Sequence, residues 1–290
     1  MSKKFITSDD QLRASSAEFW HTYYQSMKEL HERRGRPIQA PLKDRNLGTT
    51  DSKHVTAFEK FWRVQLAAAL KVDPSEVGPR SYKFRPHRSK SFDVCWPLTG
   101  EPKILISIKS MQNAYRNFTN RIEEAFGDSA VLRLYHLPAV FGFFFFMLDG
   151  TVARGIAEQG KPGTGDAKSG KGKGIAPYLD LIEEGGDFFQ LTHVDEHRKE
   201  GMKQRKTKGR QNVITQSEKS LIDLVAEGPT KEGGIHYDAI AFTPTTIKRR
   251  KPDPRTVDDW AFDFSAVDKR LDFHPFIARL IDVAKFRGFI

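Results

Sequence analysis

One uninterrupted apolar run, residues 139–148, sets the strongest limit on what this chain can fold into. It reads AVFGFFFFML, with no polar residue at alternate positions. A strand with one face in water alternates apolar and polar side chains, whereas a strand covered on both faces is apolar throughout. The run is also too short to cross a bilayer as a helix. We therefore predict a buried central strand in a sheet that carries further chain on both faces.

A predicted hairpin lies upstream of this run. Residues 92–96 are rich in β-branched and aromatic types, residues 103–108 are apolar, and Gly and Pro punctuate the segment between them. After Lys109 the apolar residues recur at helical spacing, at Met111, Tyr115, Phe118, Ile122 and Phe126. The predicted local order is strand, turn, strand and helix.

Other segments carry weaker but similar patterns. Helical spacing recurs from Ser15 or Ser16 to residue 35, from 50 to 70, from 217 to 226 and from 275 to 286. Strand patterns cover residues 81–84, 131–136, 235–242 and 260–264. We expect a single α/β domain over residues 1–290, with a mixed central sheet flanked by helices. Its predicted parts are a helical N-terminal part (1–80), a core (81–150), a flexible Gly/Lys loop (155–174) and a C-terminal part that completes the fold and contacts DNA (175–290).

Polar residues on the hairpin indicate a site. Successive strand side chains alternate between faces, so Ser107 and Lys109 share one face while the isoleucines beside them share the other. Asp93, on the paired strand, is expected next to them. Glu123 lies fourteen positions after Lys109 (123 − 109), on a helix that can pack back over the hairpin. Carboxylates suit Mg²⁺, and a lysine beside such an ion can orient a water and neutralise charge on a phosphate.

Asp93 followed by Ser107 and Lys109 resembles the core of the PD-(D/E)xK nuclease superfamily, which includes many type II restriction endonucleases. Most members have an acidic residue where this chain has Ser107. A subgroup resembles the chain more closely, with Ser-x-Lys on the strand and the glutamate displaced to the next helix, at about the spacing of Glu123. In that subgroup an arginine directly precedes the glutamate, whereas here an isoleucine does, and Glu124 is therefore an alternative.

The resemblance implies a restriction-endonuclease-like fold and a Mg²⁺-dependent cleavage of double-stranded DNA at a short site. Asp93 and either Glu123 or Glu124 would bind the metal, Lys109 would position or activate the attacking water, and Ser107 would hold a water or ligand nearby. The expected products carry 5′-phosphate and 3′-hydroxyl ends. Cutting both strands of a symmetric site requires a symmetric oligomer, most simply a homodimer.

Other interpretations of the same residues stay open. Asp93 and Lys109 can be ordinary surface residues, and Glu123 can lie on a solvated helix face. Glu59, in the preceding helical segment, matches an accessory acid that some members of the superfamily supply, with a surface role as the alternative. A repair or junction-resolving nuclease of the same superfamily and a DNA-binding protein without catalysis are the competing functions.

The charge of the chain favours a polyanionic partner. Its formal net charge is +10 and its pI about 9.5, and nucleic acid is the leading candidate for such a partner. The candidate DNA contacts, each with a solvated surface as the alternative, are Arg85, Arg88, Lys90, Asn113, Asn117, Asn120, Arg121, Lys206, Lys208, Arg210, Lys248, Arg249 and Arg250.

Cysteine content and the N-terminus bear on location. The single cysteine, Cys95, excludes an internal disulfide and a cysteine-rich zinc site. The first ten residues, MSKKFITSDD, contain no apolar signal core. We therefore expect an intracellular protein without a membrane partner, in the cytoplasm of a prokaryotic cell.

Overall fold

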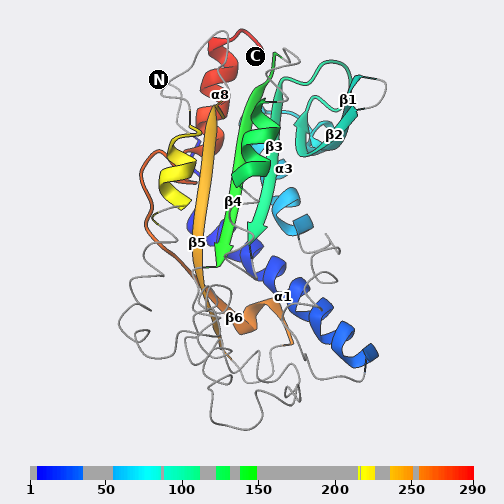
Figure 1. Ribbon diagram of the computed structural model, residues 1–290, viewed down its shortest axis with the longest axis vertical. Helices are drawn as coiled ribbons and strands as arrows, with labels where there is room; N and C mark the ends of the chain where they lie inside the picture. The colour runs from blue at the N-terminus through cyan, green and yellow to red at the C-terminus, as the bar shows by residue number, and fades with distance from the viewer. Residues whose placement is uncertain are drawn as a thin grey trace, which may run out of the picture.

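The computed structural model describes residues 5–34, 55–85, 88–111, 122–130, 138–148, 215, 217–225, 236–250 and 255–290 (Figure 1). These residues form a mixed α/β fold around a six-stranded sheet, in which the strands lie side by side in chain order. The strands are β1 (Gly78–Arg85), β2 (Arg88–Trp96), β3 (Ile104–Met111), β4 (Val140–Leu148), β5 (Ala239–Arg249) and β6 (Trp260–Phe264). The prediction of an α/β fold with a mixed central sheet and flanking helices is confirmed at this level.

The centre of the sheet is parallel and both of its edges are antiparallel. Strands β3, β4 and β5 run in the same direction, while β1, β2 and β3 form one antiparallel meander and β5 pairs with β6 in the opposite direction. The predicted central strand is confirmed as β4, which is buried along residues 140–147. Phe144 and Phe146 contribute to one core and Phe143 and Phe145 to the other, which explains why the run lacks alternation.

Helices cover both faces of the sheet (Figure 1). One face packs against α1 (Asp9–Arg34), α3 (Thr56–Leu70) and α8 (Phe276–Phe286). The opposite face packs against the helical residues 122–130 and 217–222 and the turn after the latter, through Ile122, Ala125, Leu221 and Leu224. Two short 3₁₀ turns, η2 (Pro74–Glu76) and η4 (Val257–Asp259), precede β1 and β6. The sheet is therefore the middle of three layers.

Helix boundaries differ in part from the sequence predictions. Helix α1 begins at Asp9, before the predicted caps Ser15 and Ser16, because the Ser8 hydroxyl oxygen accepts the backbone N–H of Gln11 at 3.3 Å. Helix α8 begins at Phe276, as expected. The predicted start of the second helix, residues 50–52, lies outside the described residues, and α3 is described from Thr56.

Two strands are longer than predicted. Strand β3 continues to Met111, which pairs with Met147, so the prediction that Met111 begins a helix is wrong. Strand β5 continues to Arg249, beyond the predicted strand end at residue 242, and Pro244 lies opposite Met147. In both places pairing with β4 outweighs the local preference. The predicted strand at 131–136 and the Gly/Lys loop at 155–174 lie outside the described residues.

In the described part of the chain, no helix combines the length and the apolar character that a membrane crossing needs.

Gly142 marks the closest approach between β4 and α8. A Cβ atom at this position would lie 2.9 Å from Cζ of Phe276, 3.0 Å from Cδ1 of Leu280 and 3.3 Å from Cγ1 of Ile106. We expect Gly142→Ala to lower the free energy of unfolding by about 1–3 kcal/mol, because the packed core must shift. Urea unfolding measures the change. Gly127→Ala is the matched control, since nothing lies within 4 Å of its added Cβ, and a loss as large in the control would contradict the packing argument.

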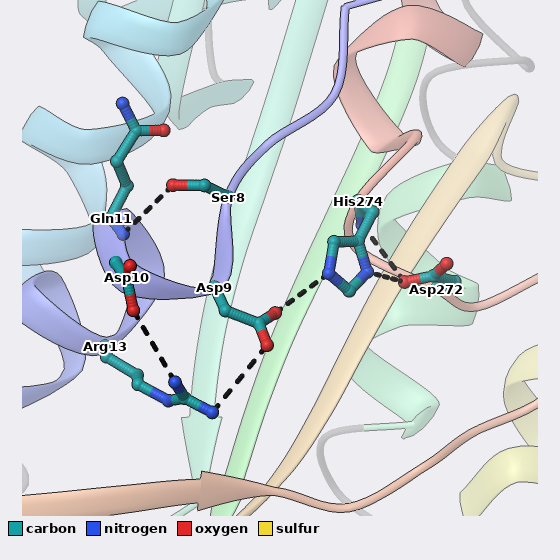
Figure 2. A network of polar contacts seen from close by, with 7 residues as sticks. All are labelled: Ser8, Asp9, Asp10, Gln11, Arg13, Asp272 and His274. Carbon is teal, nitrogen blue, oxygen red and sulfur yellow. Dashed lines mark hydrogen bonds and ion pairs between the residues drawn. The ribbon is translucent and has the colours of Figure 1, made fainter.

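A polar network joins the start of α1 to the segment before α8 (Figure 2). Nδ1 of His274 lies 2.6 Å from Asp272 Oδ1, and its Nε2 lies 2.8 Å from Asp9 Oδ1. Arg13 in turn lies 3.7 Å from the other oxygen of Asp9. A histidine that donates from both ring nitrogens must be protonated. Burial lowers the pKa of His274, but the hydrogen bonds and charges of Asp272 and Asp9 outweigh it, and the net pKa is raised.

The raised pKa of His274 predicts a pH-dependent contribution to stability. The unfolded-state pKa of a histidine is about 6.5, and that of His274 in the folded protein is higher. The stability that His274 contributes is therefore complete below about pH 6.5 and is lost as the pH rises through its folded-state pKa. We expect His274→Gln to lower the free energy of unfolding by less than about 1 kcal/mol, because the ring and both carboxylates are more than a third exposed. Urea unfolding of the wild type and of His274→Gln, from below about pH 6.5 to above the folded-state pKa of His274, measures this loss of stability. An effect that grows at alkaline pH would contradict the assignment.

Candidate functional site

The site begins where β2 and β3 separate. The two strands pair from Trp96 opposite Ile104 to Val94 opposite Ile106, and the pairing stops there. Beyond that point, Oδ2 of Asp93 accepts the backbone N–H of Ile108 at 2.5 Å. A side-chain carboxylate thus replaces the ladder bond, and the strands fork around it. We call this place the β2–β3 fork.

A β-bulge in β2 places Asp93 at the fork. The register pairs Gly78 with Cys95 and Arg80 with Phe92, so two steps along β1 match three along β2. Asp93 lies within this irregular segment. The one β1 residue between these two register pairs is Pro79, which has no backbone N–H to contribute to a ladder. Bulges redirect side chains and often occur beside active sites.

The predicted lysine and serine share one face of β3. Ile106 and Ile108 belong to the core under α1, α3 and α8, whereas Leu105 belongs to the core under residues 122–130. Ser107 and Lys109 alternate with the isoleucines, and Ser107 is buried. Lys109 is close enough to Asp93 for its positive charge to lower the pKa of that carboxyl. The structure therefore brings Asp93 and Lys109 within electrostatic range of each other.

The helical residues 122–130, which we call the covering helix, bring a glutamate to Lys109. Glu124 Oε2 lies 3.9 Å from Lys109 Nζ. Glu123, which we predicted as a metal ligand, is exposed like Glu124 but precedes it by one position, so the two side chains point about 100° apart around the helix. Whether either binds metal stays a prediction, but the geometry favours the alternative that we named, Glu124.

A second ion pair lies beside the first. Lys90 Nζ contacts Asp128 Oδ1, and both side chains are mostly buried. Asp128 follows Glu124 by four positions and therefore lies on the same side of the helix. The other carboxylate oxygen, Oδ2, is buried and has no hydrogen-bond partner in the described part of the chain. The sequence predicts Lys90 as a DNA contact and carries no signal that points to Asp128.

Glu59 reaches the fork from the opposite face of the sheet. It belongs to α3, which packs on the core that contains Ile106 and Ile108. Burial raises the pKa of the Glu59 carboxyl, and the negative charge of Asp93 raises it further. The two carboxylates are therefore electrostatic neighbours, and an accessory role for Glu59 stays a prediction.

The electrostatics of Asp93 reflect this crowding. Burial raises the pKa of the Asp93 carboxyl, and the negative charge of Asp128 raises it further. The hydrogen bond from Ile108 and the positive charges of Lys109 and Lys90 lower this pKa. The net pKa is raised. A half-buried carboxylate with an acidic neighbour is costly unless a cation balances it. The pair formed by Asp93 and Glu59 is therefore a chemically suitable place for a divalent cation.

Within the described residues, no group of three or more His, Cys, Asp and Glu side chains is arranged to hold a metal ion. This arrangement does not oppose Mg²⁺, which commonly takes one or two protein carboxylates and keeps several waters. That Asp93 binds such an ion together with Glu59 or Glu124 stays a prediction. The oxygen-only ligands favour Mg²⁺ or Mn²⁺ over zinc.

The predicted DNA contacts are only partly described. Arg85 and Arg88 are register partners at the end of the β1–β2 hairpin, and Lys248 and Arg249 lie where β5 pairs with β6. Arg250 donates from its backbone to Asp259 and from its guanidinium to Asp258. The remaining candidates lie outside the described residues: Asn113, Asn117, Asn120, Arg121, Lys206, Lys208 and Arg210.

Comparisons with protein-family models, with curated proteins and with solved structures find no match to this chain.

Proposed function

We propose that this protein is a Mg²⁺-dependent, site-specific endonuclease that cleaves double-stranded DNA, similar to type II restriction enzymes with a restriction-endonuclease-like fold. The observation that carries the proposal is the β2–β3 fork, where Asp93 and Lys109 meet. Two further carboxylates, Glu59 and Glu124, approach from opposite faces of the sheet. Acidic residues with a lysine among them, at the open end of a hairpin, suit phosphodiester hydrolysis.

The residues of the fork have complementary roles in this reaction. Asp93 and Glu59 or Glu124 would hold Mg²⁺, which lowers the pKa of a bound water and neutralises charge on the phosphate. Lys109 orients the attacking water and stabilises the negative charge that develops at phosphorus. Ser107 holds a water or ligand on the same face. The water oxygen bonds to phosphorus as the bond to the 3′ oxygen breaks, and the leaving oxygen takes up a proton.

The charge around the fork supports a DNA substrate. Strands β1 and β2 carry five basic residues from 80 to 90 and no acidic residue, so the hairpin beside Asp93 is strongly basic. Arg85 and Arg88 are register partners at the end of this hairpin. Lys248 and Arg249 are the last two residues of β5, and Lys109 lies toward the same end of the parallel β3. A phosphate backbone would balance these charges.

Incubation of supercoiled plasmid DNA with the protein and Mg²⁺ tests the proposal. We expect discrete fragments with 5′-phosphate ends, no cleavage in EDTA, and a loss of about 10²–10³-fold in rate for Lys109→Ala. Lys285→Ala is the matched control, because this lysine is exposed on α8, away from the fork. Random degradation or a preference for branched DNA would instead indicate a repair nuclease. A mobility shift without cleavage would indicate a DNA-binding protein.

A further inference from the structure

Lys90 interacts with two carboxylates, those of Asp128 and Asp93. It contacts Asp128 directly, and its charge also acts on Asp93. An ammonium group that paired with Asp93 would compete with a divalent cation for its carboxylate. The position that Lys90 takes therefore decides whether Asp93 is available.

We propose that Asp128 is a positioning residue that holds Lys90 in an ion pair beside Asp93, and thereby keeps the Asp93 carboxylate free for a divalent cation. This inference rests on the proposed function. It assigns to Asp128 a role apart from metal binding, because Asp128 contacts Lys90 and not the metal site itself.

The packing around Asp128 suits a fixed restraint. Its helix is anchored by Ile122 and Ala125 in the core, and the Tyr237 hydroxyl donates to the backbone oxygen of Ala125 at 3.0 Å. The register of the helix against the sheet is therefore set by buried contacts close to Asp128. A carboxylate held in this way can keep the flexible lysine chain in one position.

The unpartnered oxygen of Asp128 indicates that a negative charge is required at this position. Oδ2 is buried without a hydrogen-bond partner in the described part of the chain, and its charge also raises the already high pKa of the buried Tyr237 hydroxyl. Burying an unpaired acceptor is costly. The cost is explained if the full negative charge is required to hold Lys90 away from Asp93.

A double-mutant cycle tests the inference with the full chain and without DNA. Mn²⁺ binding is measured for the wild type, Asp128→Asn, Lys90→Gln and the double variant, from the electron paramagnetic resonance signal of free Mn²⁺. We expect Asp128→Asn to raise the Kd for Mn²⁺ by about tenfold when Lys90 is present, a typical coupling for groups in contact. With Lys90→Gln in place, the same replacement is expected to change the Kd by less than about twofold.

The opposite pattern overturns the inference. If Asp128→Asn weakens binding equally in both backgrounds, Asp128 acts through its own charge and not through Lys90. Circular dichroism checks folding. If Asp128→Asn alone does not fold, the Kd for Mn²⁺ of the double variant is compared with that of Lys90→Gln. Equal Kd values support the restraint of Lys90 by Asp128, and a higher Kd in the double variant refutes it.

Asp93→Asn separates this inference from the proposed function. If Asp93→Asn binds Mn²⁺ as tightly as the wild type, the proposed function loses its cation site and the restraint fails with it. If binding depends on Asp93 but the effect of Asp128→Asn is the same with and without Lys90, the restraint alone is wrong.

Discussion

Asp93→Asn is expected to reduce the rate of DNA cleavage by at least about 10³-fold while leaving the protein folded. The loss follows because a charged ligand at the fork is removed, and metal-assisted stabilisation of a phosphoryl transition state is worth several kcal/mol. The fold is retained because the amide oxygen of the new side chain can still accept the N–H of Ile108. Plasmid cleavage rates and urea unfolding at neutral pH measure the two effects separately.

Stability should not decrease in this variant. Burial raises the pKa of the Asp93 carboxyl in the folded protein, so the folded state binds more protons than the unfolded state between the two pKa values. Stability therefore falls as the pH rises through that interval, because ionising the buried carboxyl costs free energy that a neutral amide does not. Asp282→Asn, at an exposed position of α8, is the control. Cleavage within tenfold of the wild-type rate would remove Asp93 from the site.

Arg287→Met is expected to lower the free energy of unfolding by about 3–5 kcal/mol, because it leaves a buried carboxylate without its cation. Arg287 and Asp238 form an ion pair whose side chains are 4% and 2% exposed. Asp238 also accepts the backbone N–H of Phe141 at 2.8 Å, and Arg287 donates to the backbone oxygen of Ala139 at 2.9 Å. The pair therefore joins the end of α8 to the starts of β4 and β5. Urea unfolding with an unchanged m-value measures the loss.

The double variant Arg287→Met with Asp238→Asn is the matched control for this prediction. It removes the uncompensated charge, and the amide oxygen of the new asparagine side chain can still accept the N–H of Phe141. We expect it to recover part of the lost stability, since breaking a buried pair costs more than replacing both partners. A loss below about 1 kcal/mol in Arg287→Met would show that water reaches Asp238 and that the pair is not a structural anchor.

Much of the sheet could be predicted because its signals are local. The unbroken apolar run predicted β4 as a central strand, since only a strand with chain on both faces lacks polar alternation. The turn between residues 96 and 103 predicted the pairing of β2 with β3, and alternation then placed Ser107 and Lys109 on one face. Strand ends were less predictable, because Met111 and Pro244 are held in strands by pairing with β4 and not by their own preferences.

By itself, the sequence determined the central strand, the hairpin and the meeting of Asp93 with Lys109, because each follows from residues close in the chain and from the two-residue period of a strand. Only the tertiary structure decided that Glu59 approaches Asp93 from the opposite face, that Glu124 contacts Lys109, and that Lys90 pairs with Asp128. These contacts depend on how helices distant in sequence are rotated against the sheet. One position along a helix turns a side chain by about 100°, and long-range core packing sets that rotation.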